Sequence, residues 1–319
     1  MKRRIVPGTD LNASILCLGT ADFGSAVDDS RSKAILDRYI DQGGNVIDTA
    51  EAYAAWLPGG SHCSEKFLGS WLRKRRRPAQ LIISTKGGHS RFESMHIPRM
   101  SRTEVEGDLD SSLRRLGVDC IDIYWLHRDD PRRPVEEFLM MVDDFRRVGK
   151  IRYAGFSNWA QGRAEAARIA AQKLNIKGFV ASQSQWSLAK SDLNKGDPTL
   201  VQMDQFYVEW HKRNGFPLFP YSTQALGYFR RLETGTIDRA PSLVKDLFHV
   251  AANERVYERI KSLRKETGLS LSQVMLGYLL GHPFPVFPIL GPKKIEDLQE
   301  LLEAKETTLA AEQISFLQG

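Results

Sequence analysis

The chain has 319 residues, of which 42% are hydrophobic and 26% are charged, as in a soluble globular protein. This length suits one α/β barrel domain over residues 1–319. No apolar run is long enough to span a membrane, and the N-terminal residues lack the apolar core of a signal peptide. The cysteines Cys17, Cys63 and Cys120 are far apart, which argues against a disulfide framework or a zinc site. We therefore expect a cytoplasmic protein without a metal.

The net charge of +6 comes partly from one basic run, RKRRR at 73–77, at the end of a predicted helix. Such a run could be a nucleic-acid patch or a solvated helix C-terminus, where cations face the negative end of the helix dipole. We favour the helix terminus and expect no nucleic-acid partner. The surplus of positive charge helps to attract an anionic ligand.

In chain order, a Pro-Gly-Thr-Asp turn between two apolar runs predicts a β-hairpin at the N-terminus. Eight short apolar runs then predict strands at 15–19, 45–48, 81–86, 121–127, 151–157, 179–185, 217–222 and 286–291. Amphipathic segments between them predict helices at 30–44, 64–77, 101–117, 135–150, 162–174, 199–215, 253–268, 270–281 and 295–304. This alternation predicts a (β/α)8 TIM barrel. The segment 224–252 shows no strand and is expected to be a lid or binding loop.

Active sites of this barrel lie at the C-terminal ends of its strands. Asp48, Lys86 and His127 end neighbouring predicted strands, and Tyr53 follows in the loop after Asp48. A tyrosine has a pKa near ~10, and a nearby ammonium lowers it. We therefore expect Asp48 to hold Lys86, Lys86 to lower the pKa of Tyr53, and His127 to hydrogen-bond a substrate oxygen, an arrangement suited to general acid catalysis.

Several motifs support a family resemblance: NVIDTAEAY, SEKFLG, STKGG, SSLRRLGVDCIDIYWLH, GKIRYAGFSNW, SQSQWSL, YSTQALG and ILGPKKIEDLQELL. In this order they resemble the aldo-keto reductase superfamily over essentially the whole chain. The resemblance implies a (β/α)8 barrel that binds NADPH across the strand ends, without a Rossmann domain or a metal. It also implies that Asp48, Tyr53, Lys86 and His127 form the catalytic tetrad, in which Tyr53 gives a proton to a carbonyl oxygen while hydride reaches the carbonyl carbon.

The same resemblance assigns cofactor contacts. Gly19 and Thr20 are expected to bind the cofactor, and Trp186 to stack on the nicotinamide. Further contacts are implied for the carboxamide (Ser157, Asn158, Gln183), the pyrophosphate (Tyr221, Ser222) and the loop before the last predicted helix (Gly291, Lys293, Lys294).

The choice between NADPH and NADH depends on that last loop. Lys293 and Lys294 are placed to meet a 2′-phosphate. Asp297, however, stands where relatives often carry Arg or Gln, and Leu301 stands where they often carry Asn. Because a carboxylate repels a phosphate and leucine cannot hydrogen-bond adenine, we expect only a modest preference for NADPH, with NAD also possible.

The substrate is the least defined part. Phe23, Trp56 and Trp125 are candidate walls, with core packing as the alternative for Trp125. Asp22, Arg128 and Asp129 offer polar contacts. This set suits a sugar, a polyol or an aromatic aldehyde.

Other functions stay open at this stage. Lys86 could form a Schiff base in a lyase or aldolase, the chain could oxidise a polyol, or it could be a regulatory cofactor-binding subunit. A glycosidase would need a second strand-end carboxylate, for which there is no convincing candidate. The oligomeric state is not predicted.

Overall fold

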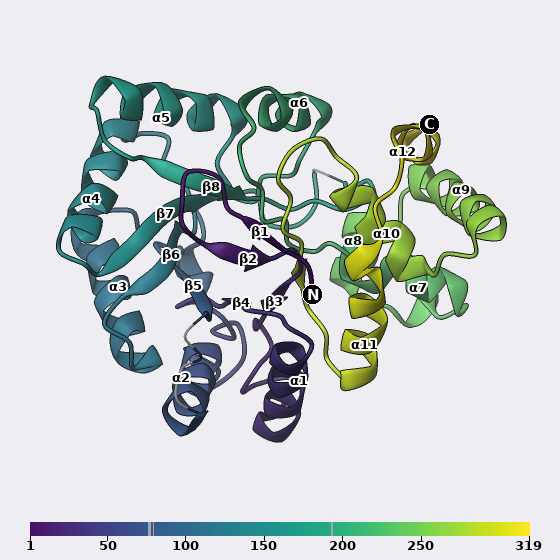
Figure 1. The fold of residues 1–319 in the computed structure, drawn as a ribbon, viewed down its shortest axis with the longest axis horizontal. Helices are drawn as coiled ribbons and strands as arrows, with labels where there is room; N and C mark the ends of the chain where they lie inside the picture. Colours follow the sequence, from purple (N-terminus) through teal and green to yellow (C-terminus); the bar gives the residue numbers. More distant parts are fainter. Residues whose placement is uncertain (76–77, 79, 193) are drawn as a thin grey trace.

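A parallel sheet forms the centre of the computed structural model, which describes residues 1–75, 78, 80–192 and 194–319 (Figure 1). Its strands follow the spatial order β8-β7-β6-β5-β4-β3-β9. Their bounds are β3 Cys17–Gly19, β4 Val46–Asp48, β5 Ile82–Gly87, β6 Ile121–Leu126, β7 Ile151–Ser157, β8 Phe179–Gln183 and β9 Ile289–Leu290. The predicted (β/α)8 fold is confirmed.

The predicted strand at 217–222 is the exception, because it forms isolated bridges instead of a regular strand. Leu218 bridges to Ser182 on β8 and to Val286 ahead of β9. Its N–H donates to the Pro285 carbonyl at 2.9 Å, and the next N–H, of Phe219, donates to Ser182 at 2.8 Å. The prolines within 217–222 have no N–H to offer a ladder. The segment nevertheless closes the barrel between β8 and β9.

Helices surround the barrel (Figure 1). The α-helices are α1 Asp29–Asp41, α2 Cys63–Arg75, α3 Arg102–Leu116, α4 Val135–Arg147, α5 Gln161–Lys173, α6 Gln205–Asn214, α7 Tyr228–Glu233, α8 Ser242–Phe248, α9 Ala251–Thr267, α10 Leu271–Leu280, α11 Ile295–Glu303 and α12 Ala311–Gln318. Short 3₁₀ turns are η1 Phe92–Ser94, η2 Ala225–Gly227, η3 Ile237–Arg239 and η4 Ala304–Glu306. Ser101 and Ser270 begin α3 and α10 with capping boxes.

Two helical regions differ from the sequence expectation. The segment 224–252, expected to be a loop, contains α7 and α8, and α12 was not predicted. In Figure 1, α7, α8, α9 and α12 lie together on one side of the barrel, beside α10. Helices α7, α8 and α12 have only 6, 7 and 8 residues and depend on tertiary packing, α7 against α8 and α12 against α9, which local sequence patterns do not show.

The N-terminal hairpin, β1 Arg3–Ile5 with β2 Asn12–Ser14, lies across the end of the barrel where the strands begin. Asn45, directly before β4, accepts the Ser14 N–H at 2.7 Å and donates to the Asn12 carbonyl at 3.0 Å. The hairpin therefore covers the N-terminal ends of the strands and leaves the C-terminal ends available for a site.

The barrel interior is filled by its own apolar cluster, separate from the larger core between sheet and helices. Trp125 belongs to this interior cluster, is fully buried and packs edge-on against Phe219 with ring centroids 5.3 Å apart. Its predicted inward direction is confirmed, but the side chain is core and not a pocket wall. It stands two residues before His127 and fills the barrel interior, where bulky side chains are needed.

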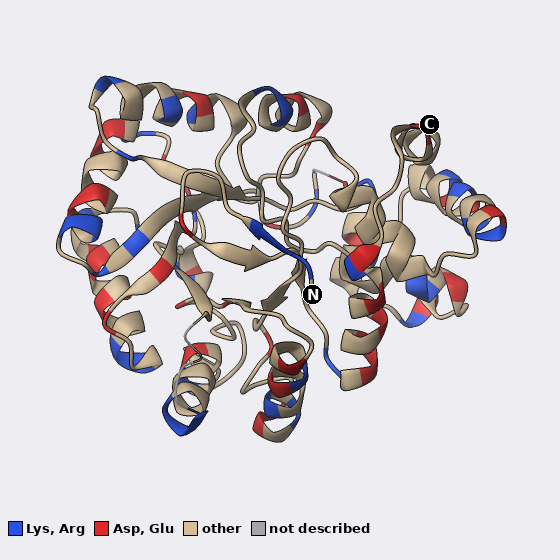
Figure 2. Cartoon of the chain, in the orientation of Figure 1, with Lys and Arg blue, Asp and Glu red and all other residues tan. Residues whose placement is uncertain are grey.

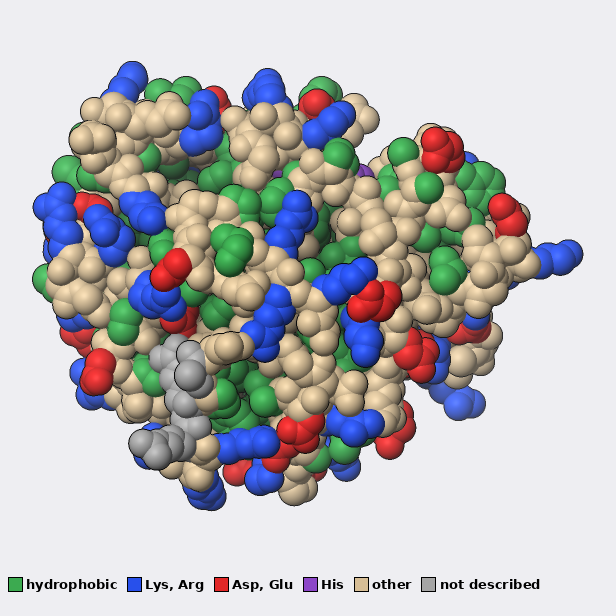
Figure 3. Space-filling view, in the orientation of Figure 1, with side chains coloured by type: hydrophobic (Ala, Val, Ile, Leu, Met, Phe, Trp, Pro, Cys, Tyr) green, Lys and Arg blue, Asp and Glu red, His purple; other side chains and the backbone are tan. Residues whose placement is uncertain are grey.

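Charged side chains gather on the outer helices, and both signs are interspersed on the hairpin side (Figures 2 and 3). The described part of the basic run, Arg73–Arg75, is exposed in the last turn of α2; residues 76–77 lie outside the described residues. Among the helices described, none is both long and apolar enough to cross a membrane. The described residues contain no cluster of histidine, cysteine and acidic side chains that could hold a metal ion.

Candidate active site

Four polar side chains meet where β4, β5 and β6 end. The Lys86 ammonium lies 2.5 Å from Asp48 Oδ2 and donates to Tyr53 Oη at 2.8 Å and to the Thr49 carbonyl at 2.7 Å. Tyr53 Oη lies 3.3 Å from the same Asp48 oxygen, and the Tyr53 ring is 6.1 Å from the His127 ring. The structure thus brings together all four residues predicted from the strand ends.

Parallel strand register explains how these residues meet. Asp48 pairs with Ser84 across β4 and β5, and Lys86 pairs with Trp125 across β5 and β6. Because side chains alternate along a strand, Ser84 and Lys86 share the face that points into the barrel. Ser84 was missed in the sequence, although its position two residues before Lys86 could have identified it.

The expected lowering of the Tyr53 pKa is wrong for this structure. Burial, followed by the negative charge of Asp48, raises the pKa of Tyr53 well above its ordinary value. Lys86 does not reverse this, because its charge is balanced by Asp48 in a buried ion pair. Tyr53 therefore carries its proton at neutral pH, while Lys86 donates a hydrogen bond to the oxygen that would become negative on losing it.

Lys86 is only 1% exposed, and burial lowers the pKa of its ammonium, against which Asp48 raises it. The contact at 2.5 Å and the hydrogen bonds to Thr49 and Tyr53 compensate for the loss of water. We infer that Lys86 remains cationic because each of its hydrogen-bond directions meets an oxygen.

His127 presents a neutral imidazole to the cluster. Burial, then the neighbouring His89, Arg128 and Lys86, lowers its pKa well below the ordinary value. Its Nδ1 is buried without a hydrogen-bond partner among the described residues. A neutral imidazole still carries one N–H, so His127 can donate to a substrate oxygen without adding charge.

The sequence suggested Arg128 as a polar contact for the substrate, but in the structure its guanidinium is bound by other residues. Its guanidinium is buried and donates to Thr199 Oγ1 at 2.8 Å, to Asp197 at 3.1 Å and to His89 Nε2 at 3.0 Å. It thereby joins the loop after β5, through His89, to the loop after β8. Asp129 likewise forms a bidentate ion pair with Arg163.

The residues expected at a nicotinamide carboxamide lie together at the C-terminal ends of β7 and β8. Ser157 pairs with Gln183, and both are buried, as is Asn158. Gln183 donates to Asp48 Oδ1 at 3.1 Å, while Asn158 Oδ1 accepts from Tyr221 Oη at 2.6 Å. The group is therefore connected directly to the four-residue cluster.

Trp186 does not lie on that surface, so its predicted stacking on the nicotinamide is contradicted. The indole is 5% exposed and packs against Tyr278, His282 and Phe284. Trp186 lies beyond the end of β8, and its side chain turns into the core around α10. The partly exposed ring beside Asn158 belongs to Tyr221.

The structure gives two of the other cofactor candidates structural roles. Thr20 is buried, and its hydroxyl bonds the Asp48 carbonyl at 3.0 Å and Ser64 at 2.7 Å, so this hydroxyl is not open to a ligand. At Gly19 a Cβ atom would meet Ile289 at 2.8 Å, which explains the glycine by the closeness of β9. Ser222 is partly exposed and Gly291 is exposed, so both are accessible.

Strained backbone also gathers in these loops. Non-glycine residues with positive φ include Asn158, Ser222, Ala225 and Leu226 in the loops that follow β7 and the closing segment. Such conformations cost free energy and cluster at functional sites.

At the start of α11, Lys293 and Lys294 are exposed. The Lys293 ammonium pairs with Asp22 at 2.9 Å, and its backbone N–H donates to Asp297 at 3.2 Å. Asp22 is thus engaged by a lysine of the loop directly before α11. Leu301 is buried in the core beneath α11, so it does not face a ligand.

Comparison with known proteins gives the family. The model of the Aldo/keto reductase family matches residues 15–319. The chain belongs to the aldo/keto reductase family. It is 27% identical to norsolorinic acid reductase B of Aspergillus parasiticus, over 99% of this chain and 83% of that protein. It is 26% identical to aryl-alcohol dehydrogenase [NADP(+)] of Phanerodontia chrysosporium, over 99% of this chain and 84% of that protein.

A solved structure agrees with this membership. A thermostable aldo-keto reductase in complex with the inhibitor epalrestat superposes with a TM-score of 0.72 at 26% identity, covering 100% of this chain and 99% of that one. The chain is therefore an oxidoreductase of this family, with the fold that its sequence motifs implied.

In this aldo/keto reductase, aromatic rings border the site. Trp56 is 45% exposed and lies 6.4 Å from the Tyr53 ring, and Phe92 is 38% exposed and lies 5.9 Å from Trp56. His89 packs on Phe92 at 5.0 Å. Phe92 and His89 were missed in the sequence, although they follow the strand that carries Lys86. Phe23, predicted as a wall, is buried against Phe67 in the core.

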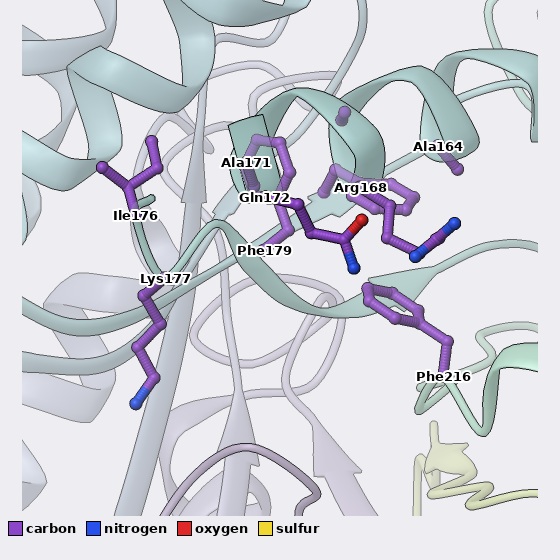
Figure 4. A pocket seen from close by; sticks show the side chains of 10 residues that line it. Ala164, Arg168, Ala171, Gln172, Ile176, Lys177, Phe179 and Phe216 are labelled. Carbon is purple, nitrogen blue, oxygen red and sulfur yellow. The ribbon is translucent and has the colours of Figure 1, made fainter. Parts of the chain in front are cut away.

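A separate pocket lies on the outside of the barrel, beside α5 (Figure 4). It has a volume of about 210 Å³, with Phe179 and Phe216 on its apolar side and Arg168 and Lys177 at its edge. Arg168 is already paired with Glu165. The lining residues include none of the strand-end cluster, so the pocket is not the active site.

Proposed function

We propose that this aldo/keto reductase interconverts a carbonyl compound and its alcohol, with Tyr53 as general acid and base. The observation that carries the proposal is the buried contact set of Lys86, 2.5 Å from Asp48 and 2.8 Å from the Tyr53 oxygen, at the C-terminal end of the barrel. A Schiff-base role for Lys86 is not favoured, because its ammonium is enclosed by Asp48, Thr49 and Tyr53.

In reduction, the raised pKa of Tyr53 keeps its proton in place until the carbonyl oxygen gains negative charge. The proton then moves from Tyr53 Oη to that oxygen, and the phenolate left behind accepts the hydrogen bond from Lys86. His127, neutral at working pH, donates an N–H to the same substrate oxygen. When bound, a reduced nicotinamide supplies the hydride that reaches the carbonyl carbon.

The residues present fit a nicotinamide dinucleotide. Ser157 and Gln183 would hold the carboxamide, and the partly exposed Tyr221 offers a ring face beside them. Gly291 and the start of α11 offer an open, cationic end for phosphate groups.

We infer that NADPH is preferred over NADH by a modest margin. Lys293 and Lys294 are exposed at the phosphate end, but Asp22 and Asp297 offset part of their charge. A relative named aryl-alcohol dehydrogenase [NADP(+)] supports the same choice.

The substrate class that fits best is a planar aromatic carbonyl compound. Trp56 and Phe92 expose aromatic surface beside Tyr53, and exposed rings of this size favour stacking partners. The names norsolorinic acid reductase and aryl-alcohol dehydrogenase among the relatives support this choice.

The proposal is tested with matched substrate pairs, such as benzaldehyde against cyclohexanecarbaldehyde, and with aldose sugars, each assayed with NADPH and NADH. We expect turnover of the aromatic member to exceed that of the saturated one. Tyr53→Phe should lose nearly all turnover while its affinity for NADPH, followed by protein fluorescence, stays close to the parent value. Substantial steady-state turnover by this variant would refute the role of Tyr53.

A further inference from the structure

Ser84 contacts the carboxylate that anchors the cluster. Its hydroxyl donates to Asp48 Oδ1 at 2.7 Å, and Gln183 donates to the same oxygen at 3.1 Å. The other oxygen, Oδ2, faces Lys86 at 2.5 Å and Tyr53 at 3.3 Å. The two oxygens of Asp48 are thus divided between neutral donors on one side and the reacting pair on the other.

This division is built into the sheet. Ser84 is the direct register partner of Asp48, and both are buried. A carboxylate can turn about its last bond, which is a broad and weakly restricted torsion. Without Ser84, only the longer contact from Gln183 at 3.1 Å would hold Oδ1. Both oxygens could then approach Lys86, and Tyr53 would face a differently placed and less shielded charge.

We propose that Ser84 is a positioning residue for the reaction: with Gln183, it turns Asp48 so that one oxygen alone meets Lys86 and Tyr53. This inference rests on the proposed function of Tyr53. By donating to the carboxylate, Ser84 also partly offsets the negative charge that disfavours the Tyr53 phenolate. In alcohol oxidation the phenolate must accept a proton, so Ser84 sets the pH at which the reverse reaction becomes fast.

The test compares Ser84→Ala and Ser84→Thr with the parent. Ser84→Ala should lower kcat about tenfold or more, the scale of one lost hydrogen bond to a charged group. The rising limb of kcat against pH in alcohol oxidation should move to higher pH. Ser84→Thr keeps the hydroxyl, so its kcat and the position of its pH limb should both stay close to those of the parent. Should Ser84→Ala fail to fold, Ser84→Cys keeps the volume with a weaker donor and should shift the limb in the same direction.

Thr85→Val is the matched control. Thr85 is the next residue on β5, is fully buried and donates to another buried carboxylate, Glu65, at 2.6 Å, but on the opposite face of the strand. It should lower the thermal midpoint as Ser84→Ala does, yet leave the pH limb unchanged. An equal shift of the limb in both variants would overturn the proposal.

A crystal structure of Ser84→Ala gives a readout that does not need activity. We expect the Asp48 carboxylate to turn, so that both oxygens approach the Lys86 ammonium. An unturned carboxylate together with an unchanged pH limb would refute the positioning role. A parent protein that reduces no carbonyl compound would refute the proposed function instead, and the crystallographic result would still decide how Asp48 is held.

Discussion

The buried pair of Asp48 and Lys86 predicts an uncommon outcome for a double variant. Lys86→Met removes the ammonium and keeps most of the side-chain volume, but leaves the Asp48 carboxylate 2% exposed with no cation beside it. Breaking one partner of a buried pair costs about 3–5 kcal/mol. Because Ser84 and Gln183 still donate to Asp48 Oδ1, we expect a cost near the lower end, about 3 kcal/mol.

Adding Asp48→Asn to Lys86→Met removes the stranded charge. The amide oxygen can still accept from Ser84, so most of the lost stability should return, leaving the double variant within about 1–2 kcal/mol of the parent. Activity should not return, because neither the ammonium nor the carboxylate is present. The double variant should therefore be nearly as stable as the parent but inactive.

The single change Asp48→Asn should leave the buried Lys86 ammonium without an anion, and the resulting loss of folding stability should depend on pH. Burial already lowers the pKa of Lys86 in the folded chain, and Asp48 is the group that raises it again. The pKa of Lys86 in the folded chain then lies below the unfolded value of ~10.4. Its contribution to folding stability is therefore present at high pH and is lost as pH falls. Asp48→Asn should thus lose more stability at pH 6 than at pH 9.

The assay is equilibrium unfolding in urea for the parent and the variants, with turnover of one substrate measured in parallel. The slopes of the unfolding curves should agree, so that the midpoints report stability. If the double variant is as unstable as the sum of the single changes, the pair is not a coupled buried ion pair, and our account of the site fails.

Three further variants test the surroundings of the cluster. Replacing Lys293 and Lys294 together by Ala should narrow or reverse the preference for NADPH, and Asp297→Arg should widen it, measured as the ratio of kcat/KM for the two cofactors; an unchanged ratio in the double Ala variant would remove these lysines from phosphate recognition. Asp197→Asn should loosen the loop that Arg128 holds, raising the substrate KM several-fold and speeding proteolysis of residues 187–204, whereas unchanged KM and cleavage would mean that this contact does not order the loop.

Much of the architecture was predictable from local sequence. Alternating apolar runs and amphipathic segments predict the (β/α)8 order, because strand and helix periodicity are properties of neighbouring residues. The strand-end rule of this fold then selects Asp48, Lys86 and His127 without any knowledge of distances. Tyr53 is added by its place in the loop soon after Asp48, and the family motifs then imply its role as proton donor.

The tertiary structure decided which polar residues are free and which are committed. Arg128 and Asp129 look like ligand contacts in the sequence, yet both are engaged by residues far along the chain, Asp197 and Arg163. Trp186 packs into the core beside α10, against Tyr278. Such outcomes depend on long-range contacts that composition and spacing do not encode.

For the pKa of Tyr53, too, the sequence and the tertiary structure determine different things. The sequence determines that a lysine and a tyrosine stand at neighbouring strand ends, and this alone predicts a lowered pKa. Burial and the placement of Asp48 beside Lys86 reverse the direction, because a balanced ion pair no longer acts as a free cation and the phenolate loses its water. The sequence by itself determined the barrel, the family and the four residues of the cluster. Only the tertiary structure decided their charges and which of their neighbours can meet a ligand, since both depend on the removal of water and on partners brought together by folding.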